Sequence, residues 1–306
     1  MNITFLHEID TGFMAATLKP AFERLGHHCT VMQGWKTHIE PNLNHVDYLL
    51  SEVDDTTILK REFEATDLFI IRATDALMYD TGVIPYLTAH NTIFRLHGYD
   101  LLELNRPYSL TTWRINLFNK HPFICTYNDP TFIGRLHGNV FYIERPMNFD
   151  ILPRRKKTDE VFALMSPTNM YKKGAQALSK TWKSNGITLK IIANTTRTEV
   201  LELKAQASYM IDNVEPNYDG GPYGMNSVEA WYMRIPTFSR YHPWSTIVCP
   251  ELPLLTHNVT LDNVQQTIEE YEVDKRQLKY AHDYALRTHD PVHIAQQYIT
   301  LKEGIE

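Results

Sequence analysis

Short apolar runs alternate with helical patterns over the first half of the chain. The first run, residues 3–6, precedes a pattern over about 13–25 in which apolar residues recur with the period of a helix. Pro20 lies inside that pattern and is expected to kink or split the helix. Further runs that predict strands are 29–32, 68–71, 92–96, 123–125 and 140–143. Strands separated by helices predict parallel crossovers and a doubly wound α/β sheet.

The alternation restarts after a polar, basic stretch at residues 153–159, which begins with proline and has no apolar periodicity. We interpret this stretch as a linker between two domains. The strands expected after it are 161–165, 189–192 and 209–211, and the helices are 174–184, 198–207, 225–233 and most of the tail from 261, with a break at 290–291. Two α/β halves predict a ligand site in a cleft between domains.

Composition agrees with a globular protein, and the length suits two domains or one large α/β unit. The 306 residues are 43% hydrophobic and 22% charged, which excludes a disordered or fibrous chain. The formal net charge is −6. Residues 1–150 account for it, because they carry 12 Lys and Arg against 18 Asp and Glu. A chain with this balance is not a general binder of polyanions.

The cysteines and histidines give no pattern of a disulfide framework or a metal site. Cys29, Cys125 and Cys249 are widely spaced, so we expect reduced thiols and a cytoplasmic protein. His289 and His293 have the i, i+4 spacing of zinc ligands, but Pro291 lies between them, and we interpret both as solvated surface residues. No apolar run approaches about 18 residues, and the first ten residues lack the pattern of a signal peptide.

The densest local signal is a glycine-rich loop at residues 218–224 that opens into a helix carrying Glu229. Glycines let the backbone approach a ligand closely, and the free N–H groups at a helix start bind an anion such as phosphate. A glutamate one turn inside the helix can accept hydrogen bonds from a vicinal diol such as a ribose. The alternative is an ordinary loop and helix start with a solvated glutamate.

The segment GGPYGMNSVEAWYMRIPTFSR resembles the signature of retaining glycosyltransferases of family 4, with Gly224, Glu229, Ala230 and Pro236 at matching positions. Three other segments resemble the same family in the same order along the chain. They are HEIDTGFMAATLKPAFERLGHHCTVM, IFRLHGYD, and VFALMSPTNMYKKGAQAL, which carries the family's Lys-Gly pair at residues 173–174.

The resemblance implies the GT-B fold, in which two Rossmann-like domains face each other across a cleft. The implied domains are 1–152 on the acceptor side, a linker at 153–159, and a nucleotide-sugar domain at 160–288. Residues 289–306 are expected to form a helix that crosses back to the first domain. The substrate implied is a nucleotide-diphosphate sugar, with a UDP-sugar favoured, and no cofactor or metal is implied.

The resemblance also implies roles for individual residues. Lys173 would neutralise the leaving diphosphate, and His97 would lie beside the reacting sugar carbon, so these two are the candidate catalytic residues. Glu229 would bind the ribose hydroxyls, and Gly12 would let the backbone of the first domain approach the phosphates or the acceptor. The full implied donor-binding set is Gly12, Asn169, Lys173, Gly221, Tyr223, Gly224, Met225 and Glu229.

Two positions depart from the family pattern. The family's first glutamate, eight positions before the second, falls on Gly221, and the arginine before the lysine is missing from residues 168–171. The first change removes a contact to the donor sugar, and the second removes one cation from the diphosphate site. A residue from elsewhere, such as Asp219 or an arginine, substitutes for them, or donor preference has changed, or activity is weak.

We therefore expect a retaining, metal-independent glycosyltransferase that moves a sugar to a hydroxyl acceptor, which is a saccharide, a lipid or a modified nucleic-acid base. The chain has no D-x-D triplet, the usual metal anchor of the other large glycosyltransferase fold. One alternative is an enzyme that glycosylates hydroxymethylated bases in DNA, and another is a degenerate, non-catalytic binder of sugar or nucleotide. A dehydrogenase lacks support because no G-x-G-x-x-G follows the first strand.

Overall fold

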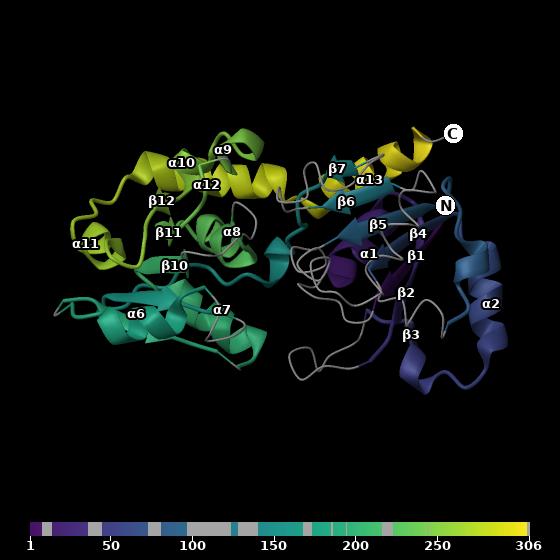
Figure 1. Cartoon of the computed structure of the whole chain (residues 1–306), viewed down its shortest axis with the longest axis horizontal. Coiled ribbons are helices and arrows are strands. Elements are labelled where there is room, and N and C mark those ends of the chain that lie inside the picture. The colour runs from purple at the N-terminus through teal and green to yellow at the C-terminus, as the bar shows by residue number, and fades with distance from the viewer. Residues whose placement is uncertain are drawn as a thin grey trace, which may run out of the picture. The chain divides into compact units, whose positions relative to one another are not determined.

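The computed structural model divides into two compact units. Unit 1 comprises Met1–Met147 together with His289–Glu306, and unit 2 comprises Asn148–Thr288 (Figure 1). The residues that the structure describes are 1–7, 14–35, 45–72, 81–96, 124–127, 140–167, 173–184, 186–193, 195–215, 223–243 and 245–304.

Unit 1 is built on a parallel sheet whose strand order is β3-β2-β1-β4-β5-β6-β7. The strands are β1 (Asn2–His7), β2 (His28–Gln33), β3 (Tyr48–Leu49), β4 (Leu68–Arg72), β5 (Thr92–Leu96), β6 (Ile124–Tyr127) and β7 (Val140–Tyr142). The chain winds outward in one direction from β1 to β3 and then in the other from β4 to β7. The topological switch point, where ligands bind in open α/β sheets, is therefore between β1 and β4.

Helices cover both faces of this sheet. α1 (Met14–Arg24) and α13 (Pro291–Glu303) pack on one face, where Phe5, Phe22 and Tyr298 belong to one apolar core. α2 (Thr56–Ala65) covers the other face, and two short turns, η1 (Leu50–Glu52) and η2 (Ile84–Tyr86), complete the described helices of this unit.

α1 runs through Pro20 as a single helix, so of the two expected effects of the proline, a kink or a split, the split does not occur. Proline removes one backbone hydrogen bond from a helix interior. Leu18, Ala21 and Phe22, on both sides of Pro20, are buried in the core of unit 1. Packing of this apolar face holds the helix together across the proline.

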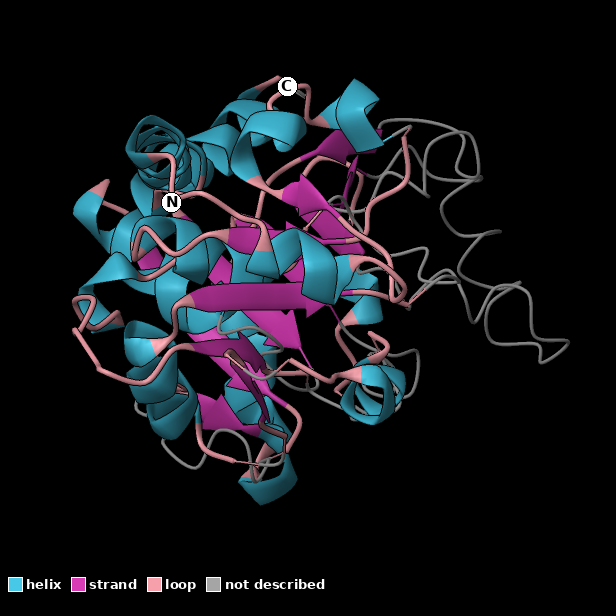
Figure 2. Cartoon of the chain, turned by 90° about the vertical axis from the view of Figure 1, so that its left-hand side faces the viewer, coloured by secondary structure: helices cyan, strands magenta, loops and turns pink. Residues whose placement is uncertain are grey.

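Unit 2 has a second parallel sheet, with the strand order β12-β11-β10-β8-β9. Its strands are β8 (Phe162–Met165), β9 (Thr188–Ile191), β10 (Tyr209–Asn213), β11 (Thr237–Ser239) and β12 (His257–Asn258). Its helices are η5 (Phe149–Ile151), α6 (Ala175–Thr181), α7 (Arg197–Gln206), α8 (Met225–Tyr232), α9 (Ser245–Val248), α10 (Leu252–Leu255), α11 (Val264–Glu269) and α12 (Lys275–Thr288). Figure 2 shows these strands flanked by helices. None of the helices described in either unit is long and apolar enough to cross a membrane.

The stretch 153–159 packs on unit 2. The backbone N–H of Lys156 donates to the carbonyl of Ala205 at 2.7 Å, and Arg155 Nη1 donates to the carbonyl of Arg234 at 2.7 Å. The chain changes unit a few residues earlier, between Met147 and Asn148, and again between Thr288 and His289.

His289 is buried in unit 1, so the expectation of a solvated surface histidine was wrong. Its Nδ1–H donates to the carbonyl of Arg145 at 2.7 Å, and its own carbonyl accepts from the N–H of Met147 at 2.9 Å. Burial lowers the pKa of His289, which keeps the imidazole neutral. His289 is the first residue of the second chain segment of unit 1, and its hydrogen bonds tie it to the end of the first segment.

Candidate functional site

The candidate site lies at the switch point of the sheet in unit 2, between β8 and β10. The chain after β8 leads to Lys173 and α6, and the chain after β10 leads to Gly224 and α8. Both connections leave the carboxyl ends of parallel strands, so they meet at one edge of the sheet. This arrangement brings together residues about 50 positions apart in the sequence without any local motif.

Asp212, near the end of β10, links the two connections. Its Oδ1 forms an ion pair with Lys173 Nζ, and its Oδ2 accepts hydrogen bonds from the N–H of Gly224 at 2.8 Å and from Ser227 Oγ at 2.7 Å. Burial alone would raise the pKa of Asp212, but the Lys173 ammonium and these hydrogen bonds hold it below its ordinary value. The carboxylate therefore stays ionised and holds Lys173 against the start of α8.

The backbone around Lys173 is unusual for a non-glycine residue. Lys173 has a φ of 62°, and Gly174 follows it with a φ of 77°, so two successive residues adopt the left-handed region. The carbonyl of Lys173 accepts from the N–H of Val214 at 3.0 Å, which ties this turn to the residue after β10. The Lys173 side chain is 18% exposed, so it is partly accessible to solvent while its Nζ pairs with Asp212.

We expect Gly174→Ala to lower the free energy of unfolding by about 2–4 kcal/mol, because the residue is left-handed and the new Cβ overpacks the turn. That Cβ would stand 2.8 Å from Val214 Cγ2 and 3.1 Å from the backbone nitrogen of Glu215. Urea unfolding measures the change. Gly186→Ala is the matched control, since an added Cβ meets no atom within 4 Å there, and equal losses in the two variants would contradict the prediction.

The start of α8 offers backbone donors to an anion. The N–H of Gly224, the N-cap residue, is used by Asp212. Within the described part of the chain, the N–H groups of the next residues, Met225 and Asn226, have no acceptor. Free N–H groups at a helix start and a neighbouring lysine are the donors that a phosphate group requires. Met225 and Gly224 were both predicted to contact the donor. The N–H of Met225 is available to a ligand, whereas the N–H of Gly224 is already bonded to Asp212.

Glu229, one turn into α8, is buried and paired on both of its oxygens. Its Oε1 lies 2.9 Å from Arg197 Nη2, and its Oε2 forms an ion pair with Lys204 Nζ. Burial alone would raise the pKa of Glu229, but the Lys204 and Arg197 cations lower it below its ordinary value. The alternative of a solvated glutamate is therefore wrong, because only 3% of this side chain is exposed.

Lys204 connects Glu229 to the loop after β8. Its Nζ also donates to Asn226 Oδ1 at 2.6 Å, and Asn226 Nδ2 donates to the carbonyl of Ser166 at 2.9 Å. The Lys204 side chain is 1% exposed, and such burial of an ammonium is tolerated only with hydrogen-bonded partners of opposite charge. The network therefore holds α7, α8 and the end of β8 in one arrangement around Glu229.

The structure brings together Lys173, Gly224 and Met225 at the start of α8, and it places Glu229 in the same helix. Tyr223 is the residue before Gly224, and its ring packs edge-on against the ring of Trp231, with centroids 4.7 Å apart. Gly12, His97, Asn169 and Gly221, together with Asp219, lie outside the described residues.

Sequence reasoning missed Asp212, Arg197 and Lys204. The spacing of Arg197 and Lys204 was a usable signal, because residues seven positions apart in a helix lie on the same face. The apolar Leu201, three positions before Lys204, lies on that face too. Two cations on one partly apolar face indicate a buried acidic partner. No local signal identified that partner as Glu229.

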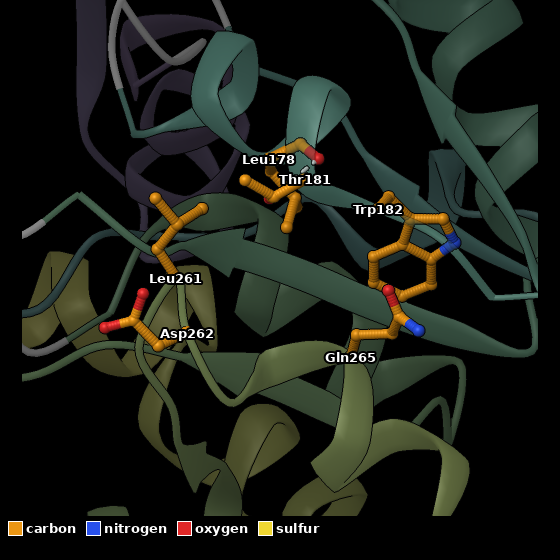
Figure 3. Close-up of a pocket in the computed structure, with 6 residues that line it drawn as sticks. All are labelled: Leu178, Thr181, Trp182, Leu261, Asp262 and Gln265. Carbon is orange, nitrogen blue, oxygen red and sulfur yellow. Dashed lines mark hydrogen bonds between the residues drawn. The ribbon is translucent and has the colours of Figure 1, made fainter.

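A small pocket of about 220 Å³ lies at the far end of α6 from Lys173, between α6 and α11 (Figure 3). Its lining residues are Leu178, Thr181, Trp182, Leu261, Asp262 and Gln265. None of these belongs to the candidate site. Among the residues that the structure describes, no group of three or more His, Cys, Asp and Glu side chains gathers as a metal site.

No protein-family model matches this sequence. No curated protein sequence matches it either. Solved structures resemble it over their whole length. One is Anabaena Alr3699/HepE in complex with UDP and glucose, with a TM-score of 0.69, 14% identity, and coverage of 99% of this chain and 100% of that one.

Two further solved structures cover most of both chains. An alpha-glucosyltransferase in complex with UDP and a 13-mer DNA containing a central A:G mismatch has a TM-score of 0.65 and 10% identity, over 99% of each chain. AviGT4, a glycosyltransferase involved in avilamycin A biosynthesis, has a TM-score of 0.59 and 13% identity, over 99% of this chain and 97% of that one. Likeness at such low identity shows the fold, and it confirms the predicted GT-B fold of two Rossmann-like domains.

Proposed function

We propose that this protein is a glycosyltransferase that moves a sugar from a nucleotide-diphosphate donor to a hydroxyl acceptor. The observation that carries the proposal is the pairing of Lys173 with the start of α8 at the switch point of unit 2. A lysine and free N–H groups at one helix start form a site for a diphosphate. The proposed donor is a UDP-sugar, and the proposed location is the cytoplasm.

The proposed chemistry is retaining and needs no metal. As the bond from the sugar to the diphosphate breaks, negative charge grows on the leaving oxygen, and the Lys173 ammonium stabilises it there. The N–H groups of Met225 and Asn226 share that charge in place of a cation. The diphosphate departs on the face that the acceptor enters, and a leaving-group oxygen takes the acceptor proton. His97 is proposed to lie beside the reacting carbon.

Glu229 is proposed to bind the ribose hydroxyls. Each carboxylate oxygen has two lone pairs, so pairing with Arg197 and Lys204 leaves acceptor capacity on both oxygens. The two cations hold the carboxylate ionised and in one orientation, which is the state that accepts hydrogen bonds from a diol.

The test is calorimetric titration of the full chain with UDP, GDP, ADP and TDP, followed by a hydrolysis and transfer assay with the sugar form of the tightest ligand. We expect UDP to bind most tightly and Lys173→Met to weaken it by at least tenfold. Binding of no nucleotide would overturn the donor site. Nucleotide binding with neither hydrolysis nor transfer would identify a non-catalytic binder instead.

A second candidate is a glycosyltransferase that acts on hydroxymethylated bases in DNA. The observation that favours it is the likeness in fold to the alpha-glucosyltransferase that was solved with UDP and a DNA 13-mer. Against it stands the excess of negative charge in residues 1–150. Transfer of labelled sugar to hydroxymethylated duplex, and none to saccharide or lipid acceptors, would select this candidate.

A further inference from the structure

A row of polar side chains crosses the carboxyl edge of the sheet in unit 1. Three neighbouring strands end in polar residues, β2 in Gln33, β1 in His7 and β4 in Arg72. In the strand register, His7 pairs with Gln33 on one side and with Arg72 on the other. The register of β4 and β5, continued by one residue, places Arg72 beside Arg95. We call these four residues the edge row.

The edge row marks the end of a core face. Residues in register on neighbouring parallel strands point to the same face, and so do residues two positions apart on one strand. Two positions before the edge row stand Val31, Phe5, Ile70 and Ile93, which are all buried in the core that α1 and α13 cover. The edge row therefore follows an apolar row at the switch point between β1 and β4, where ligands of such sheets bind.

Charge in the edge row is one-sided. Two of its members are arginines and none is acidic, although residues 1–150 as a whole carry more acidic than basic side chains. His7 is engaged with its neighbour, since its Nε2 lies 3.2 Å from Gln33 Oε1.

Arg95 lacks the partners that a buried guanidinium requires. The residue is 3% exposed, and its Nη1 donates to the Tyr298 hydroxyl of α13 at 2.5 Å. Its Nε and Nη2 have no hydrogen-bond acceptor in the part of the chain that the structure describes. A buried cation without an anionic partner is strongly unfavourable, so the unused donors point to a missing oxyanion.

We propose that the edge row of unit 1 binds a terminal phosphate group. A guanidinium donates through parallel N–H groups to two oxygens of a phosphate, which would occupy the Nε and Nη2 donors of Arg95. Because Arg95 is buried, the anion must be compact and terminal, which excludes the backbone phosphodiester of a duplex. The identity of this anion rests on the proposed function. In a glycosyltransferase it would belong to the acceptor, which we infer to be a small phosphorylated molecule such as a sugar phosphate.

The test is calorimetric titration of the full chain with inorganic phosphate and with glycerol 3-phosphate. Lys173→Met serves as the background, because it removes the phosphate site proposed in unit 2. In that background we expect Arg95→Gln to weaken binding of both probes at least tenfold. The matched control is Arg61→Gln, an exposed arginine on α2, which should leave both affinities unchanged.

Thermal unfolding separates a ligand site from a merely structural arginine. In the same Lys173→Met background, Arg95→Met removes a buried cation that has no anionic partner among the described residues. We therefore expect its Tm without phosphate to equal or exceed that of Lys173→Met alone, and the rise in Tm with phosphate to disappear. Retained phosphate stabilisation in this variant, or no binding of either probe in the Lys173→Met background, would overturn the proposal. UDP binding in unit 2 is measured separately on Arg95→Met with Lys173 intact, and this single variant should preserve it.

Discussion

Lys173→Met is expected to reduce kcat for sugar transfer by about 10²–10³, the loss that follows removal of one positioned donor to developing negative charge. Lys173 is the cation that meets the start of α8 through Asp212, and its side chain also reaches solvent. The assay is transfer of labelled sugar from the donor that binds most tightly. Lys180→Met changes an exposed lysine on α6, the helix that follows Lys173, and should leave kcat unchanged.

Removing Lys173 also leaves the buried Asp212 without its cation, so lost activity must be separated from lost folding. Asp212→Asn in the same chain removes that unpaired charge while keeping hydrogen-bonding groups for Gly224 and Ser227. We expect the double variant to regain most of the Tm lost by Lys173→Met without regaining transfer. Recovery of transfer in the double variant would show that Lys173 acts only on the fold.

Lys204→Met is expected to lower the free energy of unfolding by about 3–5 kcal/mol, because it breaks a buried ion pair and leaves one oxygen of Glu229 uncompensated. Urea unfolding followed by circular dichroism measures the change. Lys279→Met is the matched control in the same unit. Its partner Asp283 and Lys279 itself are both well exposed, so about 0–1 kcal/mol is expected there.

The Lys204 pair should also shape the acid stability of the protein. The folded-state pKa of Glu229 is lowered, so its stabilisation is present above the unfolded pKa and is lost as pH falls through the folded pKa. We expect Lys204→Met to show a smaller loss of stability between neutral and acid pH than the wild type. The double variant with Glu229→Gln should recover part of the stability at pH 7, and purely additive losses in this cycle would contradict a direct pair.

The strands with continuous apolar runs were predictable from sequence alone. β1, β4, β5 and β8 each bury nearly every residue, and such runs bounded by polar residues indicate parallel strands. β3 and β12 are two residues long each, too short for any periodicity to appear. They exist because neighbouring strands supply the hydrogen bonds, which is tertiary information.

The sequence was a better guide to where the candidate residues lie than to which side chains they pair with. The glycine loop before α8 and the Lys-Gly pair before α6 are local patterns that could be read from the sequence, and the structure places Lys173 and Gly224 at one edge of the sheet. The partners of Glu229 were not predictable, since Lys204 lies 25 positions away and meets it only after α7 and α8 pack. Asp212 gave a weaker clue, as an acid directly after the apolar residues 209–211 of β10.

The core of unit 1 combines chain segments that are synthesised at very different times. Its core contains Ile294, Ala295, Tyr298 and Ile299 from α13, the last described helix of the chain. A ribosome delivers the first strand of that sheet long before it delivers this helix, whereas every residue of unit 2 has been made by Thr288. All residues of unit 2 are therefore synthesised before α13, while the amino-terminal sheet keeps one apolar face partly uncovered until α13 is available.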